Sequence, residues 1–95
     1  MHVVVNHLRL REPLPPESLT AAERAGQALL DAGGLAFHLV RVDDTHLILV
    51  LFFATAEDAD RVARDVGGPW MREHVVPYLA GGTERSLGEV IVSSS

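Results

Sequence analysis

The sequence predicts a single α+β domain spanning residues 1–95, with elements in the order β-α-β-β-α-β. The main observation is segment 47–53, a run of seven apolar residues that is too short to cross a membrane and is rich in strand-favouring residue types. Alternating patterns at 2–11 and 35–42 predict further strands, and stretches with helical spacing lie between the strands. An unbroken apolar run in a strand requires cover on both faces, so segment 47–53 is expected at the centre of the sheet.

The first half of the chain predicts one strand and one helix. The strand at 2–11 places Asn6 on one face and His7 on the other, because successive strand side chains point in opposite directions. Pro16 fits the first turn of a helix that runs to about residue 32, where its missing N–H costs nothing. An apolar stripe follows this helix at Leu19, Ala22, Gly26, Leu29 and Leu30. Gly33 is expected to end the helix as a left-handed cap.

The middle of the chain predicts a hairpin followed by a second helix. Strand 35–42 is joined to segment 47–53 by the short polar link Asp43-Asp44-Thr45, so the two strands are expected to pair in antiparallel fashion. Thr55 has the position and chemistry of an N-cap residue for a helix that extends to about Val66.

The last third predicts another helical segment and a final strand. Gly67-Gly68-Pro69 is expected to interrupt the second helix, and Pro69 to begin a new helical segment that Pro77 kinks or divides. The final strand is expected at Leu87–Val92. This element order is the split arrangement of the ferredoxin-like fold, a four-stranded antiparallel sheet with strands one and three in the middle.

Composition excludes several classes of function. The net charge is −5 and the eight basic residues form no cluster, so neither nucleic acid nor an anionic membrane is an expected partner. The absence of cysteine excludes disulfides, thiolate zinc sites and a cysteine nucleophile. His2, His38 and His46 show no ligand-like spacing with an acidic residue, so no metal site is expected. No signal peptide pattern is visible, and a cytoplasmic location is the default expectation.

The ferredoxin-like arrangement predicts a homodimer. Both helices of this fold cover the same side of the sheet, which leaves alternate residues of an all-apolar strand on the other side. Burial of such side chains is worth about 1.5–3 kcal/mol each. We therefore expect two copies to pack their sheets face to face as a dimeric α+β barrel, with His7 on the dimer side.

The chain resembles the antibiotic biosynthesis monooxygenase branch of the dimeric α+β barrel superfamily. The resemblance is carried by the first strand Val3-Val4-Val5-Asn6, by segment 47–53 running into Thr55-Ala56-Glu57-Asp58-Ala59, and by two later segments. These are Gly68-Pro69-Trp70-Met71-Arg72-Glu73-His74 and Pro77-Tyr78-Leu79. The resemblance implies oxidation of a small phenolic compound, with neither metal nor other cofactor, in an apolar pocket between the helices and the sheet.

The resemblance also implies roles for individual residues. Asn6 stands where oxygenating members carry an asparagine that stabilises the substrate oxyanion. His74 has a side chain suited to a general base, and Trp70, Tyr78 and Phe53 are expected to bind the substrate ring.

Simpler readings of the same residues remain open. Asn6 fits a structural amide bonded to a helix end, His74 fits a packing histidine, and Trp70 and Tyr78 fit a lid or core over the sheet. A non-catalytic binding or accessory dimer is the alternative function. Haem degradation is a further one, because His74 has the spacing of the haem-ligating histidine in related proteins, although their tryptophan on the preceding helix is missing from this chain.

Overall fold

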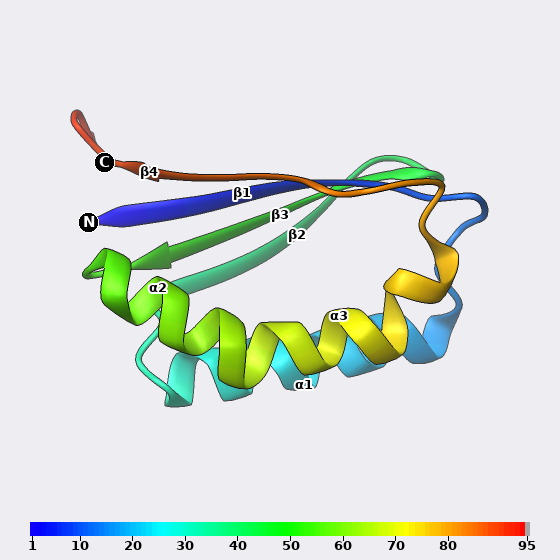
Figure 1. The fold of residues 1–95 in the computed structure, drawn as a ribbon, viewed down its shortest axis with the longest axis horizontal. Helices are drawn as coiled ribbons and strands as arrows, with labels where there is room; N and C mark the ends of the chain where they lie inside the picture. The colour runs from blue at the N-terminus through cyan, green and yellow to red at the C-terminus, as the bar shows by residue number, and fades with distance from the viewer. Residues whose placement is uncertain (95) are drawn as a thin grey trace.

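The structure is a computed structural model that describes residues 1–94, and it has a four-stranded sheet with a helical layer on one face (Figure 1). The strands are β1 (His2–Arg9), β2 (Ala36–Asp43), β3 (His46–Phe53) and β4 (Glu84–Glu89). The helices are α1 (Pro16–Asp31), α2 (Ala56–Val62) and α3 (Gly68–His74), with a π-helical turn η1 (Ala63–Gly67) and a 3₁₀ turn η2 (Val76–Tyr78).

The sheet has the strand order β2-β3-β1-β4, and all of its pairings are antiparallel. The predicted fold class is confirmed, with β1 and β3 in the middle. In the register of β1 with β3, Asn6 lies opposite Leu49 and His7 lies opposite Ile48. Because α1, α2 and α3 all lie on one side of the sheet, its other face is not covered by any element of residues 1–94 (Figure 1).

Helix α1 begins and ends as predicted. Pro16 occupies its first turn, and Gly33 follows its end with a φ of 113°, a conformation that favours glycine. Gly26 lets the helix approach β2 closely, because a Cβ there would lie 2.8 Å from the ring of Phe37. Leu30 is 42% exposed, so its predicted place in the buried stripe is wrong. Ser18 is buried instead, and its hydroxyl donates a hydrogen bond to the carbonyl oxygen of His74 at 2.9 Å.

The predicted helix break at Gly67-Gly68-Pro69 is wrong. Residues 56–74 form one continuous helical path, in which both glycines have right-handed helical dihedral angles (Figure 1). The chain absorbs them in the π-helical turn η1, where the N–H of Gly68 donates to the carbonyl oxygen of Ala63, five residues back. The start of α2 is as predicted, because the Oγ1 of Thr55 accepts a hydrogen bond from the N–H of Asp58 at 3.1 Å.

The last strand, β4, covers Glu84–Glu89, not the predicted Leu87–Val92. The limits of β4 are set by its neighbour β1. The pairing begins with Glu84 opposite His7 and ends with Glu89 opposite His2. Beyond that point β1 ends, and the N–H of Val90 makes one further bond to the carbonyl oxygen of Met1 at 2.9 Å. The apolar pattern at 87–92 therefore lies partly outside the sheet.

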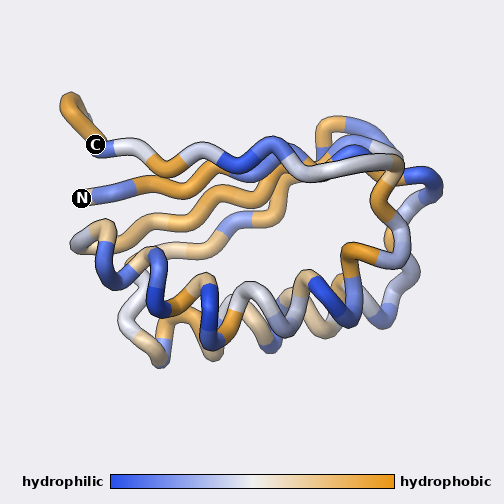
Figure 2. The backbone as a smooth tube through the Cα atoms, in the orientation of Figure 1, coloured by the Kyte–Doolittle hydropathy of each residue, from blue (hydrophilic) through white to orange (hydrophobic). Residues whose placement is uncertain are grey.

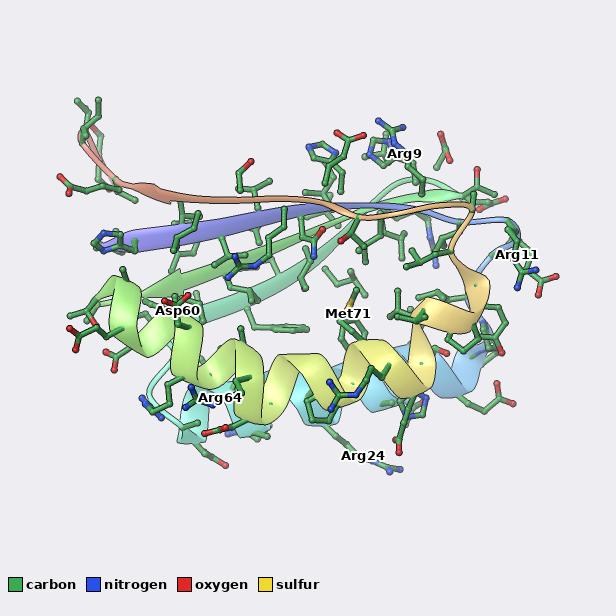
Figure 3. The ribbon with its side chains drawn as sticks, in the orientation of Figure 1. Arg9, Arg11, Arg24, Asp60, Arg64 and Met71 are labelled. Atoms are coloured by element: carbon green, nitrogen blue, oxygen red, sulfur yellow. The ribbon has the colours of Figure 1, made fainter. Side chains whose placement is uncertain are left out.

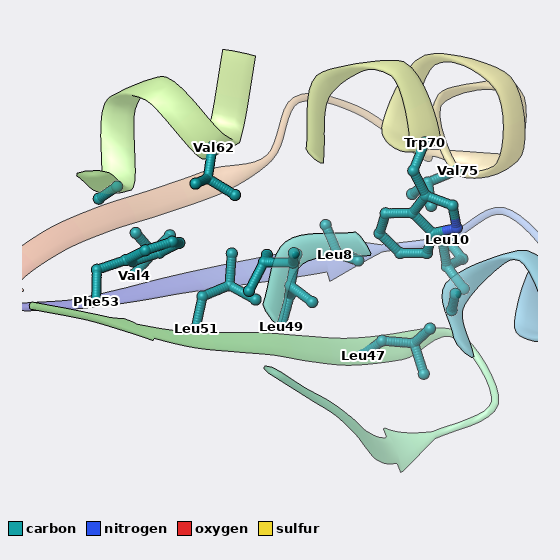
Figure 4. Packing of buried hydrophobic residues seen from close by; sticks show 13 residues of the cluster. Val4, Leu8, Leu10, Leu47, Leu49, Leu51, Phe53, Val62, Trp70 and Val75 are labelled. Carbon is teal, nitrogen blue, oxygen red and sulfur yellow. The ribbon is translucent and has the colours of Figure 1, made fainter. Parts of the chain in front are cut away.

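The core lies between the sheet and the helices, and Figure 4 shows its packing. Hydropathy along the chain is highest on the central strands (Figure 2). The buried hydrophobic side chains are Val4, Leu8, Leu10, Ala22, Leu29, Leu47, Leu49, Leu51, Phe53, Ala59, Val62, Trp70 and Val75. On β3 the burial alternates, so that Ile48, Val50 and Phe52 point to the uncovered face and are half-buried. Among residues 1–94 no helix is both long and apolar enough to cross a membrane.

Candidate functional site

A cavity of about 200 Å³ lies between the sheet and the helical path of residues 56–74. Its walls are mostly apolar and come from β1, β3, η1, α3 and β4. The lining residues are Val4, Asn6, Leu49, Leu51, Ala63, Gly67, Gly68, Met71 and Arg85. Figure 3 shows Met71 reaching from α3 toward the sheet, whereas Arg24 projects from the other side of the helical layer.

Asn6 is the polar residue of β1 in this cavity. It is 7% exposed and lies between the buried side chains of Val4 and Leu8 on the inner face of the strand. Its Oδ1 atom is buried and has no hydrogen-bond partner within the part of the chain that the structure describes. A buried amide oxygen without a partner costs about 1–3 kcal/mol, so this position is costly for the free protein. The simpler reading, in which Asn6 bonds a helix end, is not what the structure has.

Arg85 brings a positive charge to the same cavity. It lies opposite Asn6 in the register of β1 with β4, so both side chains stand on the same face of the sheet. No ion pair of Arg85 is present among residues 1–94. An amide and a free guanidinium thus face one apolar space, which is an arrangement suited to a small anion with an apolar body.

Residues Trp70 and His74 lie on another side of α3. Both line a groove of about 380 Å³ between α1 and the helical path of 56–74, together with Ala25 and Glu73. The Nε2 atom of His74 lies 3.5 Å from a carboxylate oxygen of Glu73. Trp70 is 5% exposed and packs edge to face on Phe37, with ring centroids 6.4 Å apart. Neither side chain lines the cavity that contains Asn6.

The other two predicted site residues are also separate from that cavity. Phe53 is fully buried in the core, at the opposite end of the cluster from Trp70 (Figure 4). Tyr78 lies in η2, where it packs against the edge of the core and its carbonyl oxygen accepts a hydrogen bond from the N–H of Arg11 at 2.8 Å. Of the five site residues predicted from the sequence, the structure brings only Asn6 to the cavity, and the roles assigned to the others stay predictions.

Two lining residues were missed by the sequence interpretation. Arg85 precedes the segment predicted as the final strand, so its place beside Asn6 became visible only with the true register of β4. Met71 received no role in the sequence analysis, and in the structure its side chain reaches from α3 toward the sheet. The signal that could have found Arg85 is the short polar stretch of β4, which does not fit a solvent-free strand; no such signal marks Met71.

The two glycines of the cavity roof give a test of this geometry. A Cβ at Gly67 would meet no atom within 4 Å, and the residue has helical dihedral angles. Gly67→Ala should therefore raise the free energy of unfolding by about 0.5–1 kcal/mol in urea denaturation. Gly68→Ala is the matched control, because its Cβ would lie 3.2 Å from the carbonyl oxygen of Ala63 and the gain should shrink or reverse. A loss of stability at Gly67 would show that the space there is filled.

Comparison with known proteins finds similarity in structure only. No protein-family model matches the chain, and no curated protein is similar in sequence. The cofactor-independent oxygenase SnoaB from Streptomyces nogalater is similar in structure with a TM-score of 0.72 and 14% identity, over 97% of this chain and 94% of that one. A structure described as an antibiotic biosynthesis monooxygenase gives a TM-score of 0.75 and 12% identity, over 97% and 100% of the two chains.

A third structure is MhuD, a haem-degrader from Mycobacterium tuberculosis, with a TM-score of 0.66 and 18% identity over 100% of both chains. These likenesses cover nearly the whole chain and confirm the resemblance predicted from the sequence at the level of the fold. The chain has the ferredoxin-like α+β fold of the antibiotic biosynthesis monooxygenases.

Proposed function

We propose that the protein is a cofactor-independent monooxygenase that oxidises a small phenolic compound in the cavity between the sheet and α3. The observation that carries this proposal is the buried Asn6 amide, whose Oδ1 has no partner and which faces an otherwise apolar space. Proteins rarely leave such a group unpaired, and a bound ligand is one of the few things that explains its cost. Monooxygenases of the same fold support the reaction class.

In this proposal Asn6 and Arg85 stabilise the ionised substrate. The Asn6 Oδ1 first accepts a hydrogen bond from the hydroxyl of the bound phenol, which pairs this buried oxygen. Once the hydroxyl is ionised, rotation of the amide lets its side-chain N–H donate to the phenolate oxygen, and the Arg85 guanidinium places positive charge beside it. Contacts to the ionised oxygen favour the phenolate over the phenol, so the proton can leave to solvent past the exposed Arg85. The electron-rich ring then reacts with O₂, and one phenol plus one O₂ gives one quinone plus one water without an external reductant.

His74 has a smaller part in this proposal than the sequence predicted. The side chain lines the groove against α1 and not the cavity, so proton transfer from a substrate beside Asn6 to His74 would need a rearrangement of α3. We therefore assign the anion-stabilising work to Asn6 and Arg85.

The size of the cavity limits the substrate to one ring. An apolar cavity of about 150 Å³ holds benzene, and pockets for drug-sized ligands are about 300 Å³ or larger. At about 200 Å³ the cavity fits a one-ring phenol with small substituents. Haem does not fit these residues, because it is larger than the cavity and because His74, the expected iron ligand, does not line it.

We also propose that the functional unit is a homodimer formed through the uncovered sheet face. Its central part consists of Val3, Val5, Ile48, Val50 and Phe52, which are half-buried in a single chain. Such a contiguous apolar surface favours a partner with the same chemistry, and a two-fold dimer supplies one.

Oxygen uptake tests the proposed activity. With a panel of one-ring and three-ring phenols, we expect O₂ consumption that saturates with the small phenols and matches quinone formation one to one. Protein freed of metals by a chelator should keep its rate, and boiled protein corrects for spontaneous oxidation. Saturable binding of phenols without O₂ consumption would instead establish the alternative, a non-catalytic ligand-binding dimer.

A further inference from the structure

A close pair of histidines from two different strands lies at one end of the uncovered sheet face, beyond the apolar residues at the centre of the proposed dimer interface. The Nδ1 atom of His7 on β1 lies 3.0 Å from the Nε2 atom of His46 on β3. His7 is paired with Ile48 and His46 with Arg9, so the two histidines are diagonal neighbours on the same face. We propose that this pair is a binding site for a divalent transition-metal cation.

The distance between the two nitrogens matches two ligands of one metal ion. Imidazole nitrogens lie about 2.0–2.1 Å from such a cation, so two of them at a right angle are about 3.0 Å apart and at a tetrahedral angle about 3.4 Å apart. The observed 3.0 Å agrees with neighbouring positions of an octahedral or square-planar ion, of which Ni²⁺ is typical. The ring centroids of the two histidines are 5.3 Å apart, so in the metal-free protein the two nitrogens face each other almost directly. Each ring must therefore turn by roughly 45° to point its lone pair at a shared ion with the ligands at a right angle. Because β1 and β3 already hold the two side chains together, this turn is the main adjustment that binding requires.

Metal binding changes the tautomer of one ring. In the metal-free protein one ring must donate its N–H to the lone pair of the other, because two facing lone pairs repel. A neutral imidazole carries its proton on either ring nitrogen, so a cation that binds both facing nitrogens moves the shared proton to the far nitrogen of the same ring. In the bound state the far nitrogens of both rings therefore carry N–H groups.

Acidic neighbours favour a cation at this place. Glu84 lies opposite His7 in the register of β1 with β4, which puts its carboxylate on the same face and within reach of the pair. Asp43 is near His46, but its carboxylate already accepts hydrogen bonds from the N–H and hydroxyl of Thr45 at 2.9 and 3.3 Å. Within residues 1–94 no group of three His, Asp or Glu side chains converges, so water fills the remaining positions and the affinity is moderate.

This proposal departs from the expectation of no metal site that was drawn from the sequence. That expectation considered spacing along the chain, and the two histidines are 39 residues apart in sequence. Only the register of β1 with β3 brings them together.

Calorimetric titration of the untagged protein with Ni²⁺ tests the site. We expect one ion per chain, with His7→Gln and His46→Gln each weakening binding at least tenfold. The double variant should be no weaker than either single variant, because each change alone destroys the chelate. His38→Gln is the matched control, since His38 is an exposed histidine on the same face of the sheet, opposite Val50, and its loss should change nothing.

A second measurement locates the ion without any variant. Paramagnetic Ni²⁺ should broaden the NMR signals of His7, His46 and Ile48 first, ahead of those of Met1 and His2, whose amine and imidazole form the competing site. Unchanged affinity in both single variants, or broadening centred on His2, would overturn the proposal. Broadening centred on the pair would sustain it even if a variant failed to fold.

Discussion

Replacing Asn6 by leucine should stabilise the protein and abolish its activity. The change removes a buried amide oxygen that has no partner and puts an apolar side chain of similar size into an apolar cavity. We expect the free energy of unfolding to rise by about 1–2 kcal/mol, from the unpaired polar group that is lost. Phenol oxidation should fall by about 100-fold or more, as is found when a donor to a reacting oxyanion is removed. Urea denaturation and O₂ uptake measure the two effects.

A rise in stability together with a loss of activity distinguishes a functional asparagine from a structural one. If Asn6 held the fold together, its replacement would destabilise the protein, and activity would fall only with the folded fraction. Val4→Leu is the matched control, because Val4 lines the same cavity from the same face of β1. A similar gain in stability from Val4→Leu would show that the gain comes from filling the cavity and not from removing the amide. Unchanged turnover in Asn6→Leu would exclude Asn6 from the reaction.

Val50→Glu should convert the proposed dimer into a monomer. Val50 lies in the middle of β3 on the uncovered face, with Val5 opposite it on β1 and His38 opposite it on β2. A dimer through this face would bury the new carboxylate without a partner, which costs several kcal/mol. Since each 1.4 kcal/mol changes a dissociation constant tenfold, we expect dissociation to become at least about 1,000-fold easier. Light scattering at micromolar concentration should then give half the mass of the original protein.

A control on another surface makes this result specific. Leu30 is 42% exposed on α1, which lies on the helical side of the sheet, so Leu30→Glu should leave the mass unchanged. The unsubstituted protein running as a monomer at the same concentration would refute the dimer outright, whatever the variants do. A dimer that survives Val50→Glu but not Leu30→Glu would move the interface to the helices.

Much of the fold could be predicted from the sequence because it depends on local patterns. The apolar run 47–53, the proline at 16, the glycine at 33 and the cap at Thr55 each act through their own neighbours, and each lies where the pattern predicts. The two errors in the second half have a different cause. Gly67 and Gly68 stay helical because α3 packs against the rest of the chain, and β4 takes its limits from β1. Neither cause can be recognised from the local sequence of these two segments.

The site was harder to predict than the fold, for a geometric reason. The face of a strand follows from alternation, so Asn6 was correctly placed on the inner side of the sheet. The direction of a helical side chain depends on the path of the helix before it: a segment after a break can begin at any rotation, whereas in a continuous helix each side chain lies about 100° from the one before. The unrecognised continuous helical path is therefore enough to explain why His74 and Trp70 lie against α1 while Met71 faces the cavity.

The widened turn at Ala63–Gly67 also bears on how such proteins diverge. A π-helical turn holds one residue more than the α-helix it interrupts, so a single-codon deletion there closes the turn and preserves the phase of both flanking helical stretches. The packing of Trp70 and of α2 would survive such a deletion, and only the roof above Asn6 would contract. Related proteins could in this way gain or lose a binding cavity through the insertion or deletion of one residue, while the surrounding fold stays the same.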